Sequence, residues 1–299
     1  MILPSASDIL LLSQLRKSQP YVERQPKGKL SSSSILWQDM KLAITGKGGV
    51  GKTTTSSLLA RVFAGEGKKV MAIDANPDAN LAIALGISPD EAQRITPISK
   101  LNDLIQERTG VKAGSIGAFF KVNPKVDDIP ERFSIEKDGI KLLVMGTVKE
   151  GGGGCLCPEG ALLRSLLSHL VLNRSEVVIM DMDAGVENLG RGTAKAVDAF
   201  IIVVEPGQRS FQTARAIRDL AKDLGIEKCY VVGSKTRDDS DRQFIVDNLS
   251  DFEVLGFVNY HSEVAEADRL GKSVFETAPA AVADVKEIKR KLEEIARER

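Results

Sequence analysis

The segment from Gly46 to Thr53 constrains the fold of this chain more than any other. It reads Gly-Lys-Gly-Gly-Val-Gly-Lys-Thr, comes after the apolar run 42–44 and opens a helical stretch over residues 53–64. The spacing G-x-x-x-x-G-K-[ST] between a strand and a helix is typical of a loop whose backbone N–H groups surround phosphate oxygens. The glycines let the backbone curl inward, and the helix directs its positive end at the same place.

Short apolar runs alternate with helical stretches along the rest of the chain. Such runs, bounded by helices, are typical of buried parallel strands. The predicted strands lie at residues 42–44, 70–73, 142–145, 177–180, 201–204, 231–232 and 254–255, and helical stretches include 53–64, 161–172 and 211–224. The sequence therefore predicts an α/β fold, a doubly wound and mostly parallel sheet flanked by helices. Val285, Ile288, Leu292 and Ile295 predict a last amphipathic helix packed on that sheet.

Residues 1–39 differ in composition from the rest of the chain. They contain four consecutive serines from Ser31 and three scattered prolines. We expect a flexible N-terminal arm or a start-site artefact there, because chain ends are usually poorly ordered and Met40 stands directly before the first strand. Residues 40–299 are predicted to form one P-loop domain.

The charge balance excludes some classes of partner. The 299 residues include 41 Lys+Arg and 41 Asp+Glu, which disfavours a protein that coats nucleic acid or an anionic membrane. No apolar run approaches the roughly 18 residues of a membrane span. The three cysteines are too few for a disulfide framework and indicate a reducing compartment. We therefore expect a cytoplasmic protein without a nucleic-acid or membrane partner.

The residue types in the loop predict that it binds the phosphates of a nucleotide together with Mg²⁺. Lys52 is expected to reach the β- and γ-phosphates, and the Thr53 hydroxyl to ligate Mg²⁺. The apolar strand 177–180 ends at Asp181, a layout typical of a carboxylate that orients Mg²⁺ or its water, although such a residue can also cap a helix. The predicted nucleotide-binding residues of the loop are Gly46, Lys47, Gly48, Gly49, Val50, Gly51, Lys52, Thr53 and Thr54.

The extra lysine of the loop, Lys47, carries a family resemblance. The string Gly-Lys-Gly-Gly-Val-Gly-Lys-Thr-Thr resembles the deviant P-loop of the MinD/ParA/nitrogenase-iron-protein class, a SIMIBI-like group of P-loop NTPases. The resemblance implies an ATPase that works as a homodimer, in which Lys47 reaches the partner's nucleotide as a catalytic charge. The simpler interpretation makes Lys47 one more phosphate-attracting charge.

The segment after the second strand departs from that family. It reads Asp74-Ala75-Asn76-Pro77-Asp78, whereas relatives usually carry Asp where Asn76 stands. An amide cannot act as a base, but it can orient the attacking water. We therefore predict slow hydrolysis with Asn76 as a catalytic positioning group; the alternatives are that Asp78 substitutes or that the protein is a long-lived ATP-bound switch.

The prediction of a pocket for the nucleotide base depends on the same resemblance. Relatives often place an Asn-Lys pair where this chain has Ser234-Lys235, so the choice of ATP and ADP is implied by the family and not by these residues. A guanine-reading Asn/Thr-Lys-x-Asp motif is absent from this segment. The residues predicted to line the ATP pocket are Glu205, Pro206, Ser234, Lys235, Val258 and Asn259.

A pair of cysteines comes after a run of four glycines. Cys155 and Cys157 are one residue apart, so their thiols project to the same face of an extended segment. Pro158 favours a helix start, which places Cys157 at a positive helix end. Two thiolates are half of a tetrahedral site, and a two-fold dimer would supply the other half. Such soft ligands suit Zn²⁺ or Ni²⁺, and also Cu⁺ or an iron–sulfur cluster. A redox-active dithiol and incidental cysteines are the alternatives.

Together these motifs resemble a narrower family. The deviant P-loop, the Cys-x-Cys pair before a helix, residues 177–185 and residues 191–198 are similar to the CooC-type maturation ATPases of carbon monoxide dehydrogenase. The resemblance implies an ATP-dependent dimeric metallochaperone that assists nickel insertion into carbon monoxide dehydrogenase or acetyl-CoA synthase. A partition or positioning ATPase of the MinD/ParA kind is the main alternative, and an electron-transfer iron protein is a third.

Overall fold

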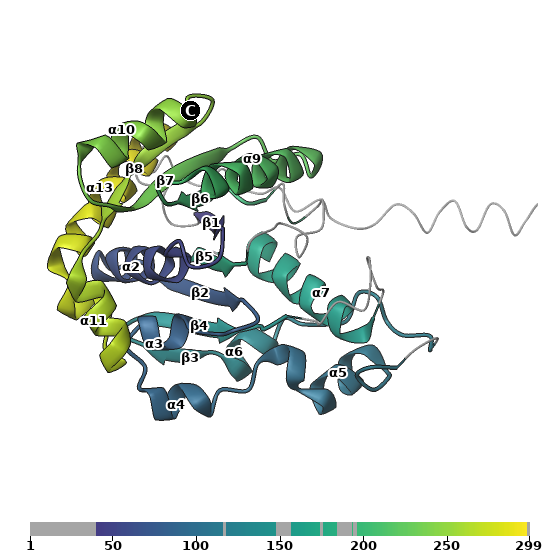
Figure 1. Ribbon diagram of the computed structural model, residues 1–299. Helices are drawn as coiled ribbons and strands as arrows, with labels where there is room; N and C mark the ends of the chain where they lie inside the picture. The colour runs from purple at the N-terminus through teal and green to yellow at the C-terminus, as the bar shows by residue number, and fades with distance from the viewer. Residues whose placement is uncertain are drawn as a thin grey trace, which may run out of the picture. The chain divides into compact units, whose positions relative to one another are not determined.

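An eight-stranded sheet forms the framework of the domain (Figure 1). The structure is a computed structural model and describes residues 40–115, 118–147, 157–173, 176–183, 193 and 196–297. The strand order is β3-β4-β2-β5-β1-β6-β7-β8, and only β3 and β4 pair antiparallel. The strands are β1 (Lys41–Gly46), β2 (Val70–Ala75), β3 (Ile135–Lys137), β4 (Ile140–Val144), β5 (Val177–Met182), β6 (Ala199–Val204), β7 (Cys229–Thr236) and β8 (Glu253–Asn259).

Helices cover both faces of the sheet, because successive strand residues point to opposite sides. Leu42 and Ile44 belong to one buried apolar cluster, and Ala43 between them belongs to the other. The first cluster is covered by α2 (Lys52–Gly65), α3 (Leu81–Ala84), α11 (Ser262–Leu270), α12 (Val274–Thr277) and α13 (Pro279–Arg297), and the second by α5 (Asn102–Thr109), α7 (Pro158–Asn173), α9 (Gln208–Asp223) and α10 (Asp239–Asn248). The doubly wound, mostly parallel sheet predicted from the sequence is confirmed.

The last helix packs as its apolar spacing predicts. Val285 and Ile288 of α13 are fully buried, and Ile288 lies so close to β8 that a Cβ atom at Gly256 would be 2.9 Å from it. Burying side chains of this size contributes about 1.5–3 kcal/mol each. The polar side of the helix is ordered as well, because the buried Lys289 pairs with Glu66 of the turn after α2.

The region between β2 and β5 holds most of the elements that the sequence did not predict. Besides α5 and the antiparallel strand β3, it contains the short segments α4 (Pro89–Gln93), η1 (Ile98–Lys100) and α6 (Ile129–Phe133). Elements of three to five residues span too few turns to show a period, so their apolar residues carry no helical or strand pattern.

The strand order places a binding crevice at the carboxyl end of β1. This strand lies between β5 and β6, where the direction in which the chain adds strands reverses. Open α/β sheets bind ligands outside the carboxyl ends of strands at such a point. In the described part of the chain, none of the helices has both the length and the hydropathy that crossing a membrane demands.

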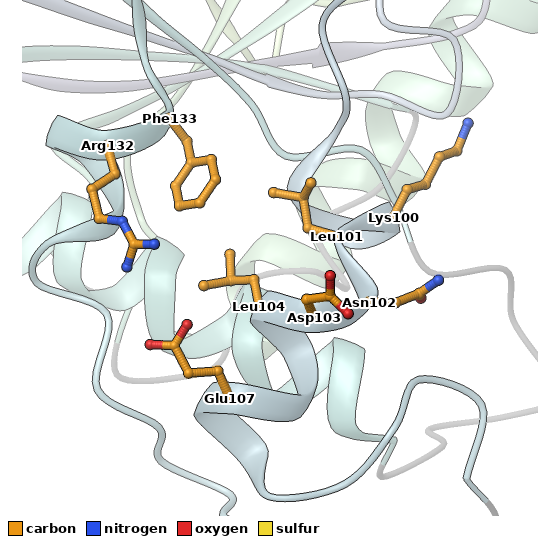
Figure 2. Close-up of a pocket in the computed structure, with 8 residues that line it drawn as sticks. All are labelled: Lys100, Leu101, Asn102, Asp103, Leu104, Glu107, Arg132 and Phe133. Carbon is orange, nitrogen blue, oxygen red and sulfur yellow. The ribbon is translucent and has the colours of Figure 1, made fainter.

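A surface pocket of about 460 Å³ lies elsewhere, between η1, α5 and α6 (Figure 2). Its polar lining mixes two cations, Lys100 and Arg132, with two carboxylates, Asp103 and Glu107, around the ring of Phe133. The opposite charges balance, so the lining selects neither an anion nor a cation.

Candidate functional site

The phosphate loop between β1 and α2 takes a path that depends on glycine, as Gly46 and Gly51 show. Gly46 has a φ of 145°, and a Cβ atom there would lie 2.3 Å from the carbonyl oxygen of Val203 on β6. Gly51 precedes the first turn of α2, which holds Thr54, and lies in the left-handed region with a φ of 101°. A side chain at Gly46 would collide with β6, and one at Gly51 would be strained.

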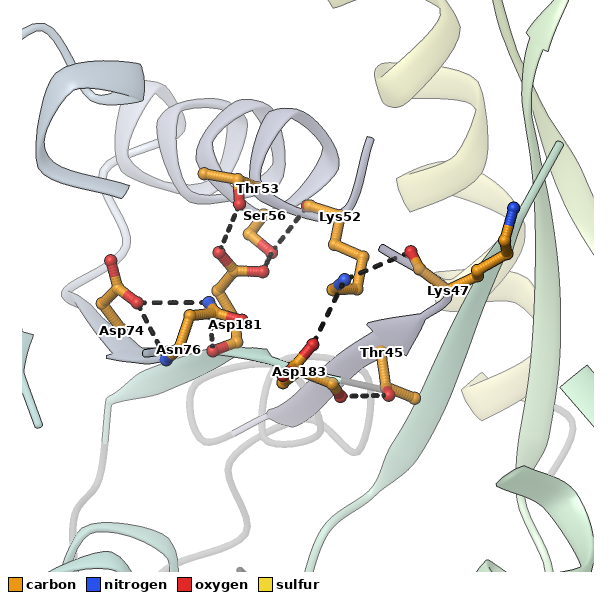
Figure 3. Close-up of polar contacts among 9 residues, drawn as sticks. All are labelled: Thr45, Lys47, Lys52, Thr53, Ser56, Asp74, Asn76, Asp181 and Asp183. Atoms are coloured by element: carbon orange, nitrogen blue, oxygen red, sulfur yellow. Dashed lines mark hydrogen bonds and ion pairs between the residues drawn. The ribbon is translucent and has the colours of Figure 1, made fainter. Parts of the chain in front are cut away.

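The side chain of Lys52 is held inside this loop. The whole residue is 8% exposed, and its ammonium donates to the carbonyl oxygen of Lys47 at 3.2 Å (Figure 3). The same ammonium lies 4.0 Å from Asp183 Oδ1. A buried cation surrounded by loop backbone attracts phosphate oxygens strongly, because burial weakens the screening by water.

Two buried carboxylates meet at the carboxyl edge of the sheet. Asp74 on β2 and Asp181 on β5 are paired in register, and neither is exposed. Thr53 Oγ1 donates to Asp181 Oδ2 at 2.7 Å, and Ser56 Oγ lies 3.2 Å from Asp181 Oδ1 (Figure 3). Burial, together with the smaller effect of the neighbouring Asp74, raises the pKa of Asp181 from its ordinary 3.8 to about 7. Burial also raises the pKa of Asp74.

Asn76 links these two strand ends. Its Nδ2 donates to Asp74 Oδ1 and to the carbonyl oxygen of Asp181, both at 3.1 Å. Its backbone N–H also donates to Asp74 Oδ1 at 3.1 Å. Both amide hydrogens are therefore used at the sheet edge, and Asn76 Oδ1 is the atom left to accept a hydrogen bond from a water molecule.

Lys47 lies on the rim of the loop, unlike Lys52. Its ammonium is 3.5 Å from Glu205 Oε1, and its side chain is 38% exposed. Figure 3 shows the Lys47 side chain extending away from that of Lys52. Exposed ion pairs of this kind contribute little to stability, about 0–1 kcal/mol, so Lys47 can leave Glu205 at small cost.

The predicted base-pocket residues differ in what their side chains contact. Ser234 and Lys235 contact the phosphate loop: a Cβ atom at Gly51 would be 2.9 Å from Ser234 Oγ, and Lys235 Nζ donates to the carbonyl oxygen of Gly49. Val258 is buried and Pro206 is half-buried, and both lie at the same edge of the sheet. Asn259, in contrast, is held within the protein.

The amide of Asn259 belongs to a polar network below the end of β8. Its Nδ2 donates to both carboxylate oxygens of Asp284 at 3.1 Å, and its Oδ1 accepts from Thr236 at 3.0 Å and from Arg242 at 2.7 Å. His261 Nε2 lies 2.9 Å from the same carboxylate. These bonds occupy the Asn259 side chain, so its contribution to a nucleotide pocket would come through the position of the strand end.

Of the two cysteines in the Cys-x-Cys pair, Cys157 can be placed and Cys155 lies outside the described residues. Helix α7 begins at Pro158, as the sequence predicts, and Cys157 Sγ accepts the Gly160 N–H at 3.3 Å. Because α7 returns to the amino end of β5, Cys157 lies at the same edge of the sheet as the phosphate loop. Within the described ranges, no group of three or more His, Cys, Asp or Glu side chains is suited to hold a metal ion.

Cys229 lies at the amino ends of the strands, opposite the carboxyl ends where the phosphate loop lies. It is the first residue of β7, and burial raises the pKa of its thiol to about 11. A thiol in that state is a poor metal ligand, because the thiolate is the binding form.

Three residues of the site were not singled out from the sequence. Asp74 follows an apolar run near the end of β2, as Asp181 does near the end of β5, so the same signal would have found it. Ser56 lies one turn after Thr53 on the buried face of α2, and helical spacing would have placed it. Asp183 reaches Lys52 from beyond the end of β5, and no local pattern predicts that contact.

The comparisons with known proteins agree with this geometry. The sequence profile of the CobQ/CobB/MinD/ParA nucleotide binding domain matches residues 41–274. The chain belongs to this family. It is 49% identical over 241 residues to the carbon monoxide dehydrogenase accessory protein CooC of Rhodospirillum rubrum. The aligned residues cover 81% of this chain and 91% of that relative. It is 48% identical to an uncharacterized ATP-binding protein of Methanocaldococcus jannaschii, over 79% and 91% of the two chains.

Solved structures show the same fold at lower identity. The MinC:MinD cell division protein complex of Aquifex aeolicus matches with a TM-score of 0.60 and 20% identity, over 85% of this chain and 95% of that one. A ParA family ATPase from Chlorobium tepidum matches with a TM-score of 0.60 and 14% identity, over 85% and 98%. The family resemblance inferred from the P-loop and the Cys-x-Cys pair is therefore confirmed.

Proposed function

We propose that this chain is a homodimeric ATPase that assists nickel insertion into carbon monoxide dehydrogenase or acetyl-CoA synthase. The observation that carries the proposal is the 49% identity with a carbon monoxide dehydrogenase accessory protein over 81% of the chain. The placement of Lys52, Thr53 and Asp181 supports the ATPase part. The placement of Cys157 at the start of α7, on the same edge of the sheet, supports the metal part.

The donor set around Asp181 fits Mg²⁺. Thr53 Oγ1 and Asp181 Oδ2 are 2.7 Å apart, and both are hard oxygen ligands of the kind that Mg²⁺ prefers. A cation there would also relieve the repulsion between Asp181 and Asp74, which adds to the effect of burial on the pKa of Asp181. Thr53 and Asp181 would hold the ion directly or through water, and Mg²⁺ would neutralise charge that develops on the phosphates.

Asn76 is proposed to position the attacking water through Oδ1, because both of its amide hydrogens are used by Asp74 and Asp181. The Asn76→Asp variant is expected to raise ATP turnover about tenfold at saturating Mg²⁺, since a carboxylate can also take the proton of that water. Steady-state phosphate release measures the effect. An unchanged rate would mean that this position does not limit the chemistry, and Asp78→Asn is the matched control: a fall in that variant alone would assign the role to Asp78.

Lys47 is proposed to act on the nucleotide of the partner subunit. In this chain its ammonium rests on Glu205 at the rim, 3.5 Å away, and points away from Lys52. The two lysines therefore have different tasks: Lys52 binds the phosphates of its own chain, and Lys47 completes the site of a second copy when ATP brings the two together.

The metal site is proposed to be completed in the same dimer. Cys155 and Cys157 supply two thiolates per chain, and two chains supply the four that a tetrahedral ion prefers. Helix α7 connects this end of the molecule to β5, and Leu162, Leu166 and Leu170 anchor it without exposure. A shift of α7 would therefore move β5, the strand that carries Asp181. Nucleotide state and metal affinity are expected to be linked through this helix.

A metal titration tests the proposal. We expect Ni²⁺ or Zn²⁺ to bind at about half an ion per chain and more tightly with an ATP analogue than with ADP, because the analogue favours the dimer. Cys155→Ala is expected to abolish binding. Cys229→Ala is the matched control and should bind normally, because Cys229 lies at the opposite edge of the sheet. Equal affinity with ADP and the analogue would contradict the coupling, and one ion per isolated chain would contradict the shared site.

A further inference from the structure

The end of β7 makes an unusual contact with the phosphate loop. Lys235 has a φ of 57°, a left-handed conformation that a lysine rarely adopts. The pairing with β8 shifts register here. Ser234 pairs with Val258 and Thr236 pairs with the next residue of β8, Asn259, so Lys235 has no partner in the register. Lys235 is therefore the extra residue of a β-bulge, and bulges commonly redirect a side chain next to a functional site.

The bulge directs Lys235 onto the loop. Lys235 Nζ donates to the carbonyl oxygen of Gly49, which lies 186 residues away in the sequence. The preceding residue, Ser234, is buried against Gly51, where an added Cβ atom would be 2.9 Å from its hydroxyl. Two successive residues of β7 thus contact two glycines of the loop, one from the side and one at the start of α2.

This contact fixes the direction of a peptide plane. In a trans peptide the C=O and the following N–H point in opposite directions. Because the Gly49 carbonyl points at Lys235, the Val50 N–H points away from Lys235 and toward the inside of the loop. There it lies 3.5 Å from the carbonyl oxygen of Lys47, which is long for a hydrogen bond, so a phosphate oxygen can replace that acceptor readily.

We propose that Lys235 is a positioning residue of the phosphate loop, which orients the Val50 N–H toward the β-phosphate by holding the Gly49 carbonyl from outside. In this role its ammonium would contact the Gly49 carbonyl and neither the base nor the phosphates. The strained backbone at Lys235 is retained because it directs the ammonium at that carbonyl, as strain at functional sites often is. The inference rests on the proposed use of ATP, and it concerns only how the loop holds a diphosphate.

Three variants separate this role from a general effect on folding. Lys235→Asn suits the left-handed backbone but is too short to reach Gly49, and Lys235→Met keeps the length without the charge. Lys235→Arg keeps both the length and the donors. Binding of ADP, AMP and inorganic pyrophosphate to each folded variant is measured by calorimetry. Unchanged thermal unfolding of Lys235→Asn shows that the domain is intact.

The asparagine and methionine variants are expected to bind ADP and pyrophosphate about tenfold more weakly, the loss of one charge-assisted hydrogen bond, and AMP almost unchanged. The arginine variant should stay within about threefold of the parent protein. An equal loss for AMP and ADP would place Lys235 on the base or ribose and overturn the proposal. So would a defect that disappears at about 0.5 M salt, where charges act over only about 4 Å, because that would indicate a long-range charge effect.

The same measurements keep this inference apart from the proposed function. If the parent protein binds neither ADP nor pyrophosphate, the ATPase assignment fails, and Lys235 has no site to order. If it binds both and the three variants bind equally well, the ATPase assignment stands and the role of Lys235 is wrong.

Discussion

Replacing Lys47 with alanine is expected to lower ATP turnover about 10³-fold while changing ADP affinity less than about threefold. Turnover and ADP affinity are expected to respond differently because the two lysines of the loop lie in different places. The Lys52 side chain is 9% exposed and lies inside the loop, whereas the Lys47 side chain is 38% exposed and contacts Glu205. A charge supplied across a dimer acts on the transition state and contributes little to the binding of product by one chain. Single-turnover hydrolysis and calorimetry with ADP measure the two effects separately.

Mixing two inactive variants tests whether Lys47 acts in trans. Lys47→Ala keeps an intact Mg²⁺ site, and Asp181→Asn keeps an intact Lys47. In a mixed two-fold dimer the first chain's site would receive Lys47 from the second chain. Half of the dimers would be mixed and each would hold one working site, so the mixture should recover about a quarter of the parent activity. If Lys47 acted within its own chain, mixing would restore nothing.

The phosphate loop could be predicted because its path is encoded in contiguous residues. At Gly46 the structure tolerates no side chain and at Gly51 it needs a left-handed backbone, and both glycines are fixed letters of the motif. Asp181 could be predicted because an apolar strand that ends in a carboxylate is a local signal as well. The same holds for α7, whose start is marked by Pro158.

The contacts between distant segments could not be predicted. The pairing of Asp74 with Asp181 depends on the register of β2 and β5, which no local pattern specifies. The bond from Lys235 to Gly49 joins residues 186 positions apart through a bulge, and bulges have no reliable signature in one sequence. The family resemblance assigns Lys235 to the base pocket, and nothing local in the sequence indicates that its side chain also contacts the phosphate loop.

The Asp181→Asn variant is expected to abolish Mg²⁺-dependent turnover and yet to stabilise the fold at pH 8. Burial raises the pKa of Asp181 from 3.8 to about 7. Because the folded-state pKa is the higher one, the folded protein binds this proton more tightly than the unfolded chain does. The free energy of unfolding therefore falls as the pH rises from about 4 to about 7, by roughly 4 kcal/mol for a shift of about three units, and stays low above that window.

The amide of asparagine removes this dependence and fits the same bonds. Its oxygen can accept from Thr53 as Asp181 Oδ2 does, and its nitrogen can donate to Ser56 Oγ, which lies 3.2 Å from Asp181 Oδ1 and donates to the carbonyl of Lys52. Urea unfolding from pH 5 to pH 8 in a chelator should show a falling stability for the parent protein and a flatter profile for the variant. Parallel profiles would assign the pH dependence to another group.

Asp74→Asn is the matched control, because it removes the same charge from the same pair but is expected to gain less stability than Asp181→Asn or to lose stability. Asp74 Oδ2 accepts the Leu81 N–H at 2.9 Å, and Oδ1 accepts two N–H groups of Asn76. An amide nitrogen in place of either oxygen would face a donor, which costs about 1–3 kcal/mol. A gain for Asp181→Asn with a smaller gain or a loss for Asp74→Asn would show that the site keeps an unfavourable ionised Asp181 for the cation it binds. Equal gains would mean that relieving the charge repulsion outweighs the hydrogen bonds of either residue.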